Sequence, residues 1–87
     1  MEAIKKFSDF NLIAHLLCNK YEEASPPILE YDHVYWFFKS TPQLDKEIIN
    51  YLSGETRVNP IAFGHFLRYV RRVAGELKSK RGVVKNE

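Results

Sequence analysis

The side chains of this chain that could do chemistry are three histidines and one cysteine, and their spacing argues against a shared site. His15, His33 and His65 fall in three different predicted elements. None has a second histidine one helical turn away with a glutamate, which is the spacing of a helical metal site. We expect surface or structural roles for all three, with His15 away from the centre of a buried helix face, His33 in a turn and His65 opposite an apolar stripe.

Cys18 stands alone, which excludes an intramolecular disulfide and the spacing of a zinc finger. On an apolar helix face a cysteine is more often a small buried hydrophobe than a nucleophile. His15 lies three residues earlier and would be its neighbour on a helix, so a catalytic cysteine–histidine pair is the alternative interpretation. An unpaired cysteine also fits a reducing compartment.

No other motif points to catalysis. Acids such as Asp9, Asp32 and Asp45 occupy capping, turn or helix-surface positions, and the four glycines are too scattered for a phosphate-binding loop. We therefore expect no enzyme, no cofactor, no metal site and no small-molecule substrate. The sequence contains no apolar run of signal-peptide or membrane-spanning length, so we expect no membrane partner and a cytoplasmic location.

The basic residues are concentrated in the C-terminal third. Residues 1–61 carry six Lys or Arg against nine Asp or Glu, whereas residues 62–87 carry seven against two, a net charge of +5. Such asymmetry favours an oriented encounter with an anionic surface, either nucleic acid or an acidic protein face. The alternative is a solvated helix that carries charge for solubility. The candidate residues for binding nucleic acid or another partner are Arg68, Arg71, Arg72, Lys78, Lys80 and Arg81.

The helix predicted to start at Asn59-Pro60 separates these cations from an apolar stripe. At 100° per residue the stripe comprises Phe63, Phe66, Leu67, Val70, Val73, Ala74 and Leu77. The arginines emerge on another side, beside Gly64 and Gly75. Glycine is unfavourable inside a helix, and we favour close packing against the chain's own sheet or loop over close approach of a partner's backbone. No Asn or Gln on this helix could read bases, so any nucleic acid should be held by its backbone.

An aromatic strand is the second candidate surface. Along residues 34–38, Val34, Trp36 and Phe38 project to one side, and Tyr35 and Phe37 to the other. Either helices cover both faces, or one face is an interface with a protein partner or a second copy of the chain. The candidate interface residues are Tyr31, Tyr35, Trp36 and Phe37.

The N-terminal elements follow from caps and breakers. Residues 3–7 are expected to form a short strand, and a helix capped by Ser8 should run over residues 9–21 with one apolar face. Residues 22–27 should interrupt regular structure, because their adjacent prolines supply no backbone donors.

The rest of the chain predicts a hairpin and two more helices. Strands at 28–31 and 34–38 flank a tight turn, and a helix starts at Thr41-Pro42 and ends before Gly54. The inner stripe of that helix is expected to comprise Leu44, Ile48, Tyr51 and Leu52.

Together these elements predict one small α+β domain over residues 1–80. A small antiparallel sheet, made of the hairpin and the N-terminal strand, should pack against three helices in the order βαββαα. Residues 81–87 are expected to form a basic, frayed tail.

The chain resembles a family of short uncharacterised proteins encoded in bacterial, archaeal and phage genomes. The resemblance rests on Phe7-Ser8-Asp9-Phe10 before the first helix, the strand at 34–38, and Val58-Asn59-Pro60 before the basic helix. It covers roughly residues 4 to 77 and implies no catalytic residue. It does imply an origin in mobile elements, whose small proteins often bind and block or recruit a host complex, as anti-CRISPR proteins do.

Two hypotheses follow. The first is a non-enzymatic binding module whose basic helix engages nucleic acid or a nucleoprotein complex. The alternative is a phage-encoded inhibitor of a host defence complex that uses the aromatic strand and the basic helix as its interface. The basic surface argues against simple mimicry of DNA.

Overall fold

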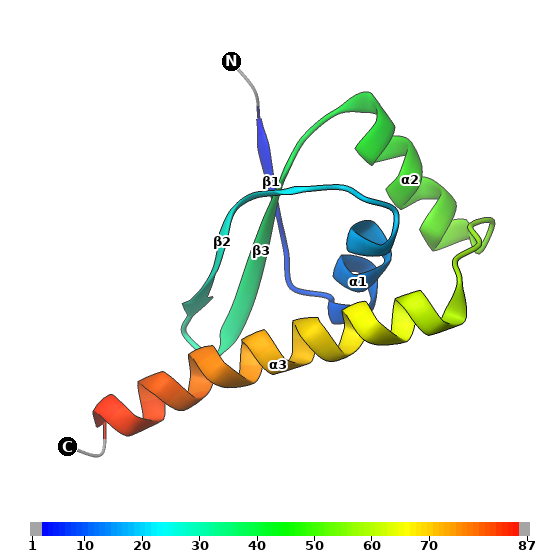
Figure 1. The fold of residues 1–87 in the computed structure, drawn as a ribbon. Helices are drawn as coiled ribbons and strands as arrows, with labels where there is room; N and C mark the ends of the chain where they lie inside the picture. The colour runs from blue at the N-terminus through cyan, green and yellow to red at the C-terminus, as the bar shows by residue number, and fades with distance from the viewer. Residues whose placement is uncertain (1–2, 86–87) are drawn as a thin grey trace.

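A computed structural model describes the backbone of residues 3–85 and the side chains of residues 3–80. The elements follow one another as β1 (Ile4–Phe7), α1 (Phe10–Cys18), β2 (Glu23–Glu30), β3 (His33–Lys39), α2 (Pro42–Ser53) and α3 (Pro60–Lys85) (Figure 1). The predicted α+β class and element order are confirmed.

The three strands form one sheet in the order β1-β3-β2, with β3 antiparallel to both neighbours. The outer strands β1 and β2 therefore run parallel to each other, and α1 makes the crossover between them. This arrangement is a split β-α-β unit, in which a third strand lies between the two parallel ones. The α2 and α3 helices follow it in the chain.

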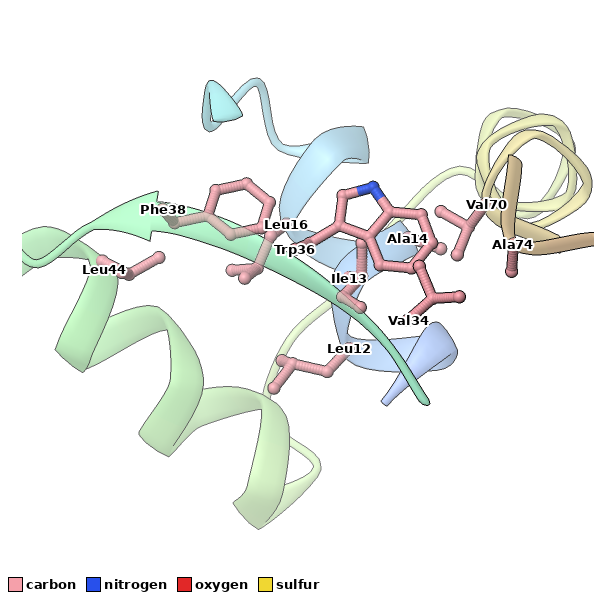
Figure 2. Packing of buried hydrophobic residues seen from close by; sticks show 10 residues of the cluster. All are labelled: Leu12, Ile13, Ala14, Leu16, Val34, Trp36, Phe38, Leu44, Val70 and Ala74. Carbon is pink, nitrogen blue, oxygen red and sulfur yellow. The ribbon is translucent and has the colours of Figure 1, made fainter. Parts of the chain in front are cut away.

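The helices cover one face of the sheet. Val34, Trp36 and Phe38 alternate along β3 and are all buried. Figure 2 shows Trp36 close to Ile13 and Ala14, with α3 on one side and α2 on the other. The side chains between them on β3 point to the opposite face, which lies outside this core. The shortest dimension of the molecule is 19 Å, which fits one sheet and one layer of helices.

The core is built mainly by α1, β3 and α3. Its buried members are Leu12, Ile13, Ala14, Leu16, Val34, Trp36, Phe38, Leu44, Val70 and Ala74 (Figure 2). The α2 helix contributes a single fully buried residue, Leu44. Leu52, expected on the inner stripe, is 75% exposed, so that expectation was wrong.

Polar contacts also connect α2 to the rest of the domain. Asp45 forms an ion pair with Lys5 of β1, and Glu47 approaches His15 of α1. The hydroxyl of Tyr21 also donates to the carbonyl of Gln43. These contacts join α2 to β1, to α1 and to the segment that follows α1.

Several boundaries differ from the predicted ones. Asp9, not Ser8, caps α1 by accepting from the N–H groups of Asn11 and Leu12, and α1 ends at Cys18. The β2 strand begins at Glu23 and includes Pro26 and Pro27, which were expected to interrupt it.

The structure shows why β2 tolerates its prolines. The strand lies at the edge of the sheet, and its register with β3 shifts between Glu23 and Ser25 and again between Ser25 and Ile28. Bulged edge strands accept proline because some of their N–H groups need no partner.

The α3 helix is also longer than expected. It was predicted to fray after Leu77, but it extends to Lys85 and runs past the hairpin end of the sheet (Figure 1). Residues 81–85 of the expected tail thus continue the helix, and residues 86 and 87 lie outside the described part of the chain.

Candidate nucleic-acid interface

The start of α3 is fixed by the cap predicted from the sequence. The Asn59 side chain accepts from the backbone N–H groups of Ile61 at 2.9 Å and Ala62 at 3.1 Å. Pro60 follows at the first helical position, where a missing N–H has no cost. This cap fixes where the helix begins and therefore which residues face the core.

The apolar stripe of α3 packs against the rest of the domain as predicted. Val70 and Ala74 are fully buried, and the partly buried members of the stripe that pack on the core are Phe63, Phe66, Leu67, Val73 and Leu77. Because α3 packs along α1 and also touches β2, its rotation about its own axis is fixed. The residues between the stripe positions are held toward solvent.

Four cations gather on the solvent side of α3. Arg68, Arg71, Arg72 and Lys78 are exposed and fall within an arc of roughly 120° at 100° per residue. We call these four residues the basic ridge. Along the axis, positions 68 and 78 are separated by about 15 Å at 1.5 Å per residue.

The remaining predicted cations do not belong to the basic ridge. Lys80 is exposed but lies on another side of the helix, about 140° from the middle of the ridge. The side chain of Arg81 lies outside the described residues. Within residues 3–80, no ridge side chain forms a salt bridge with an acid.

The near neighbours of the ridge are aromatic rings. Arg68 Nη2 lies 3.1 Å from His65 Nδ1, and the guanidinium carbon of Arg72 lies 5.7 Å from the centre of the Tyr69 ring. Neither contact neutralises the positive charge of its arginine.

The glycines beside the ridge do not pack against the domain. A Cβ at Gly75 would meet nothing within 4 Å, and one at Gly64 would meet only the flexible end of Arg68, at 3.6 Å. The favoured account, close internal packing, was therefore wrong. Both positions instead leave bare helix backbone next to the arginines.

The predicted aromatic interface is divided by the sheet. Trp36 is 0% exposed and belongs to the core, so its prediction as an interface residue was wrong. Tyr35 and Phe37 are partly exposed on the opposite face, and Tyr31 in the hairpin turn is 84% exposed. Tyr31 also has a positive φ of 58°, the left-handed backbone that tight hairpin turns require.

The face that carries Tyr35 and Phe37 also carries charged residues. The Lys6 ammonium lies 4.4 Å from the centre of the Tyr35 ring and 3.4 Å from Glu30 Oε1. The ring of His33 lies 6.2 Å from that of Tyr35. We call this surface, centred on Tyr35 and Phe37 with Lys6, Glu30 and Ile28 around them, the open sheet face.

His15 is the polar residue that the sequence interpretation misplaced. It is 2% exposed, its Nε2 lies 2.6 Å from Glu47 Oε2, and its ring centre lies 5.0 Å from that of Tyr51. The unbroken apolar run around it, from Leu12 to Leu16, was the available sign that this helix is buried on more than one side. Glu47 and not Cys18 is its partner, which favours a structural role.

Burial raises the pKa of three side chains, those of Tyr21, Glu23 and Tyr51. Desolvation raises the pKa of Tyr21 and of Tyr51, and the negative charges of Glu47 and Asp9, respectively, raise them further. Desolvation raises the pKa of Glu23 above its ordinary 4.5, and the indole N–H of Trp36 partly offsets this by favouring the carboxylate. Glu23 Oε1 and Trp36 Nε1 are nevertheless buried without a hydrogen bond of good geometry.

Among residues 3–85, no three His, Cys, Asp or Glu side chains are grouped so that they could hold a metal ion. The open hollows on the surface of the described part of the chain include one of about 350 Å³ beside Lys5 and Ile49 and one of about 250 Å³ beside Lys20 and Thr41.

Comparison with known proteins returned no matching family model, no matching curated protein and no matching solved structure. The resemblance drawn from the sequence therefore stays a prediction. Over the described residues, no helix is both long and apolar enough to cross a lipid bilayer.

Proposed function

We propose that this chain is a non-enzymatic binding protein that engages nucleic acid, free or within a nucleoprotein complex, through the basic ridge. The observation that carries the proposal is that Arg68, Arg71, Arg72 and Lys78 share one exposed side of a packed helix and form no salt bridge with a described acid. Cations spread along one side of an element are what backbone phosphates require.

The number of cations in the basic ridge sets how steeply the affinity should fall with salt concentration. Four phosphate contacts give a slope of log affinity against log salt of about −2.8 for a single strand and about −3.6 for duplex DNA. Raising the salt from 50 to 200 mM should then weaken binding by about 50- to 150-fold.

The test measures the affinity for generic single-stranded and duplex oligonucleotides across that salt range. Changing Arg68, Arg71 and Arg72 together to Glu should abolish most binding. The matched control changes Lys20, Lys46 and Arg57 to Glu, because these three exposed cations lie off α3 and give the same net charge. A salt-independent affinity, or equal losses in the two triple variants, would contradict the proposal.

The second candidate is an inhibitor or adaptor that binds an acidic face of a host protein. The same ridge favours it, because exposed cations also steer association with anionic proteins. Capture of a protein from a host lysate that depends on Arg68, Arg71 and Arg72, with no affinity for oligonucleotides, would favour this candidate over the first.

A further inference from the structure

We propose that the open sheet face is a stacking surface for the bases of a single-stranded nucleic acid. This inference rests on the proposed function and narrows it from nucleic acid in general to single strands. It uses a surface separate from the basic ridge, on the other layer of the domain.

The rings of Tyr35 and Phe37 lie on the sheet face opposite the core and are partly exposed. They alternate with the buried residues of β3, and neither belongs to the core or to the side chains packed on it. Residues two apart on a strand are about 6.6 to 6.8 Å apart along it, so each ring can take one base. Aromatic rings that bind successive bases tolerate any sequence, because every base has a flat π face.

Cations beside these rings complement a phosphate backbone. The register pairs Lys6 of β1 with Phe37, and Lys39 with Ile4 on the same face. Among the described strands this face carries one acid, Glu30, and its contact with Lys6 is long, at 3.4 Å, between side chains that are each nearly half exposed.

The contact of Lys6 with Tyr35 is replaceable. An exposed ion pair and an exposed cation–π contact are both weak in water. A phosphate can therefore draw the ammonium away from the ring, which opens the ring face to a base while the cation keeps an anionic partner. Lys6 thus covers Tyr35 in the free protein and would pair with a phosphate in the complex.

A duplex does not fit this surface. Its bases are stacked on one another and paired, so their faces cannot reach protein rings, whereas the splayed bases of a single strand can. The turn between β2 and β3 lies at the end of the sheet next to α3 (Figure 1), and Tyr31 in this turn is 84% exposed. A strand that leaves the open sheet face past this turn meets α3 and its basic ridge.

The experiment compares a fluorescent 12-nucleotide single strand with the duplex of the same sequence at one moderate salt concentration. We expect tighter binding of the single strand. Tyr35→Thr and Phe37→Thr should each weaken it by about 5- to 150-fold, the range for losing one stacked base, with the salt slope unchanged. Threonine keeps the strand preference of these positions, and Tyr35→Trp should retain the affinity.

The controls separate this inference from the proposed function. Ile49→Ala removes an exposed apolar side chain of α2, 65% exposed, and should leave the affinity unchanged. If ridge reversal abolishes binding while Tyr35→Thr and Phe37→Thr leave it intact, or if the duplex binds as tightly, the stacking surface is refuted and the ridge stands. If neither nucleic acid binds, both proposals fail. A protein partner lost with Tyr35→Thr would reassign the open sheet face to protein.

Discussion

The contact between His15 and Glu47 should stabilise the attachment of α2 to the rest of the domain. His15 is 2% exposed, the side chain of Glu47 is 21% exposed, and their nitrogen and oxygen atoms lie 2.6 Å apart. The α2 helix has one fully buried residue, Leu44, and two partly buried ones that pack on the core, Ile48 and Tyr51, so this polar contact adds to a small apolar attachment. We therefore predict that Glu47→Ala lowers the free energy of unfolding.

The neighbours of the ring set the size of the loss. Removing Glu47 leaves a buried imidazole N–H without its acceptor, which typically costs about 1–3 kcal/mol. Asn19 Nδ2 lies 3.3 Å from His15 Nε2, and an amide nitrogen can donate to this ring nitrogen once the ring adopts the other tautomer. That rescue places the expected loss in the lower half of the range, about 1–2 kcal/mol.

Urea unfolding followed by circular dichroism measures this loss. With a slope of about 1 kcal/mol/M, as for small proteins, the midpoint should fall by about 1–2 M. Lys46→Ala, at the exposed neighbouring position of α2, is the control and should change stability by less than about 0.5 kcal/mol.

A double variant isolates the contact itself. Replacing both partners by apolar groups of similar shape can be nearly neutral, so His15→Leu with Glu47→Leu should be more stable than either single change. A Glu47→Ala variant as stable as the original chain, or a double variant that merely adds the two single losses, would refute the reasoning.

Three further predictions concern titration and helix ends. Burial raises the pKa of Glu23, so the folded chain retains a proton that the unfolded chain releases, and stability is lost as the pH rises from about 4.5 through the raised pKa. Glu23→Gln should remove that loss, so it should stabilise the chain more at pH 7 than at pH 4. Urea unfolding at the two pH values tests this, and an equal difference at both would count against it. Thr41→Ala removes the hydroxyl that accepts from the Leu44 N–H at 3.0 Å. It should lower the free energy of unfolding by about 1 kcal/mol, measured by thermal or urea unfolding. An unchanged free energy of unfolding would show that this cap does not stabilise α2. Gly54 has a φ of 76° with open space around it, so Gly54→Ala should destabilise by about 1 kcal/mol through backbone strain alone, while a stabilised variant would contradict that.

The sequence predicted the helices of this domain well because their ends are marked by local chemistry. Thr41-Pro42 and Asn59-Pro60 begin helices, and Gly54 ends one in the left-handed conformation. Such caps act within a few residues of the chain and need no tertiary information. The apolar stripe of α3 was predictable for the same reason, since its period is that of the helix.

The wrong sequence predictions concern residues whose burial or secondary structure depends on contacts with other helices and strands. Pro26 and Pro27 belong to β2 because this strand lies at an edge and bulges, which depends on the order of the strands in space. His15 is buried because Glu47, 32 residues away, supplies its partner. The two sides of β3 could not be ranked from sequence, because both are apolar and only the position of α1 decides that Trp36 is covered and Tyr35 is not.

On α3 the residues that pack on the core are different from the residues that carry charge, so substitutions can test binding without unfolding the domain. Val70 and Ala74 fix the rotation of the helix against α1, whereas Arg68, Arg71 and Arg72 lie in solvent and form no described salt bridge that supports the fold. Surface substitutions of this kind usually change stability by less than about 0.5 kcal/mol. Reversing these charges should therefore alter binding while the domain stays folded. The same holds on the open sheet face, where Phe37 can be changed without touching the core that Trp36 anchors.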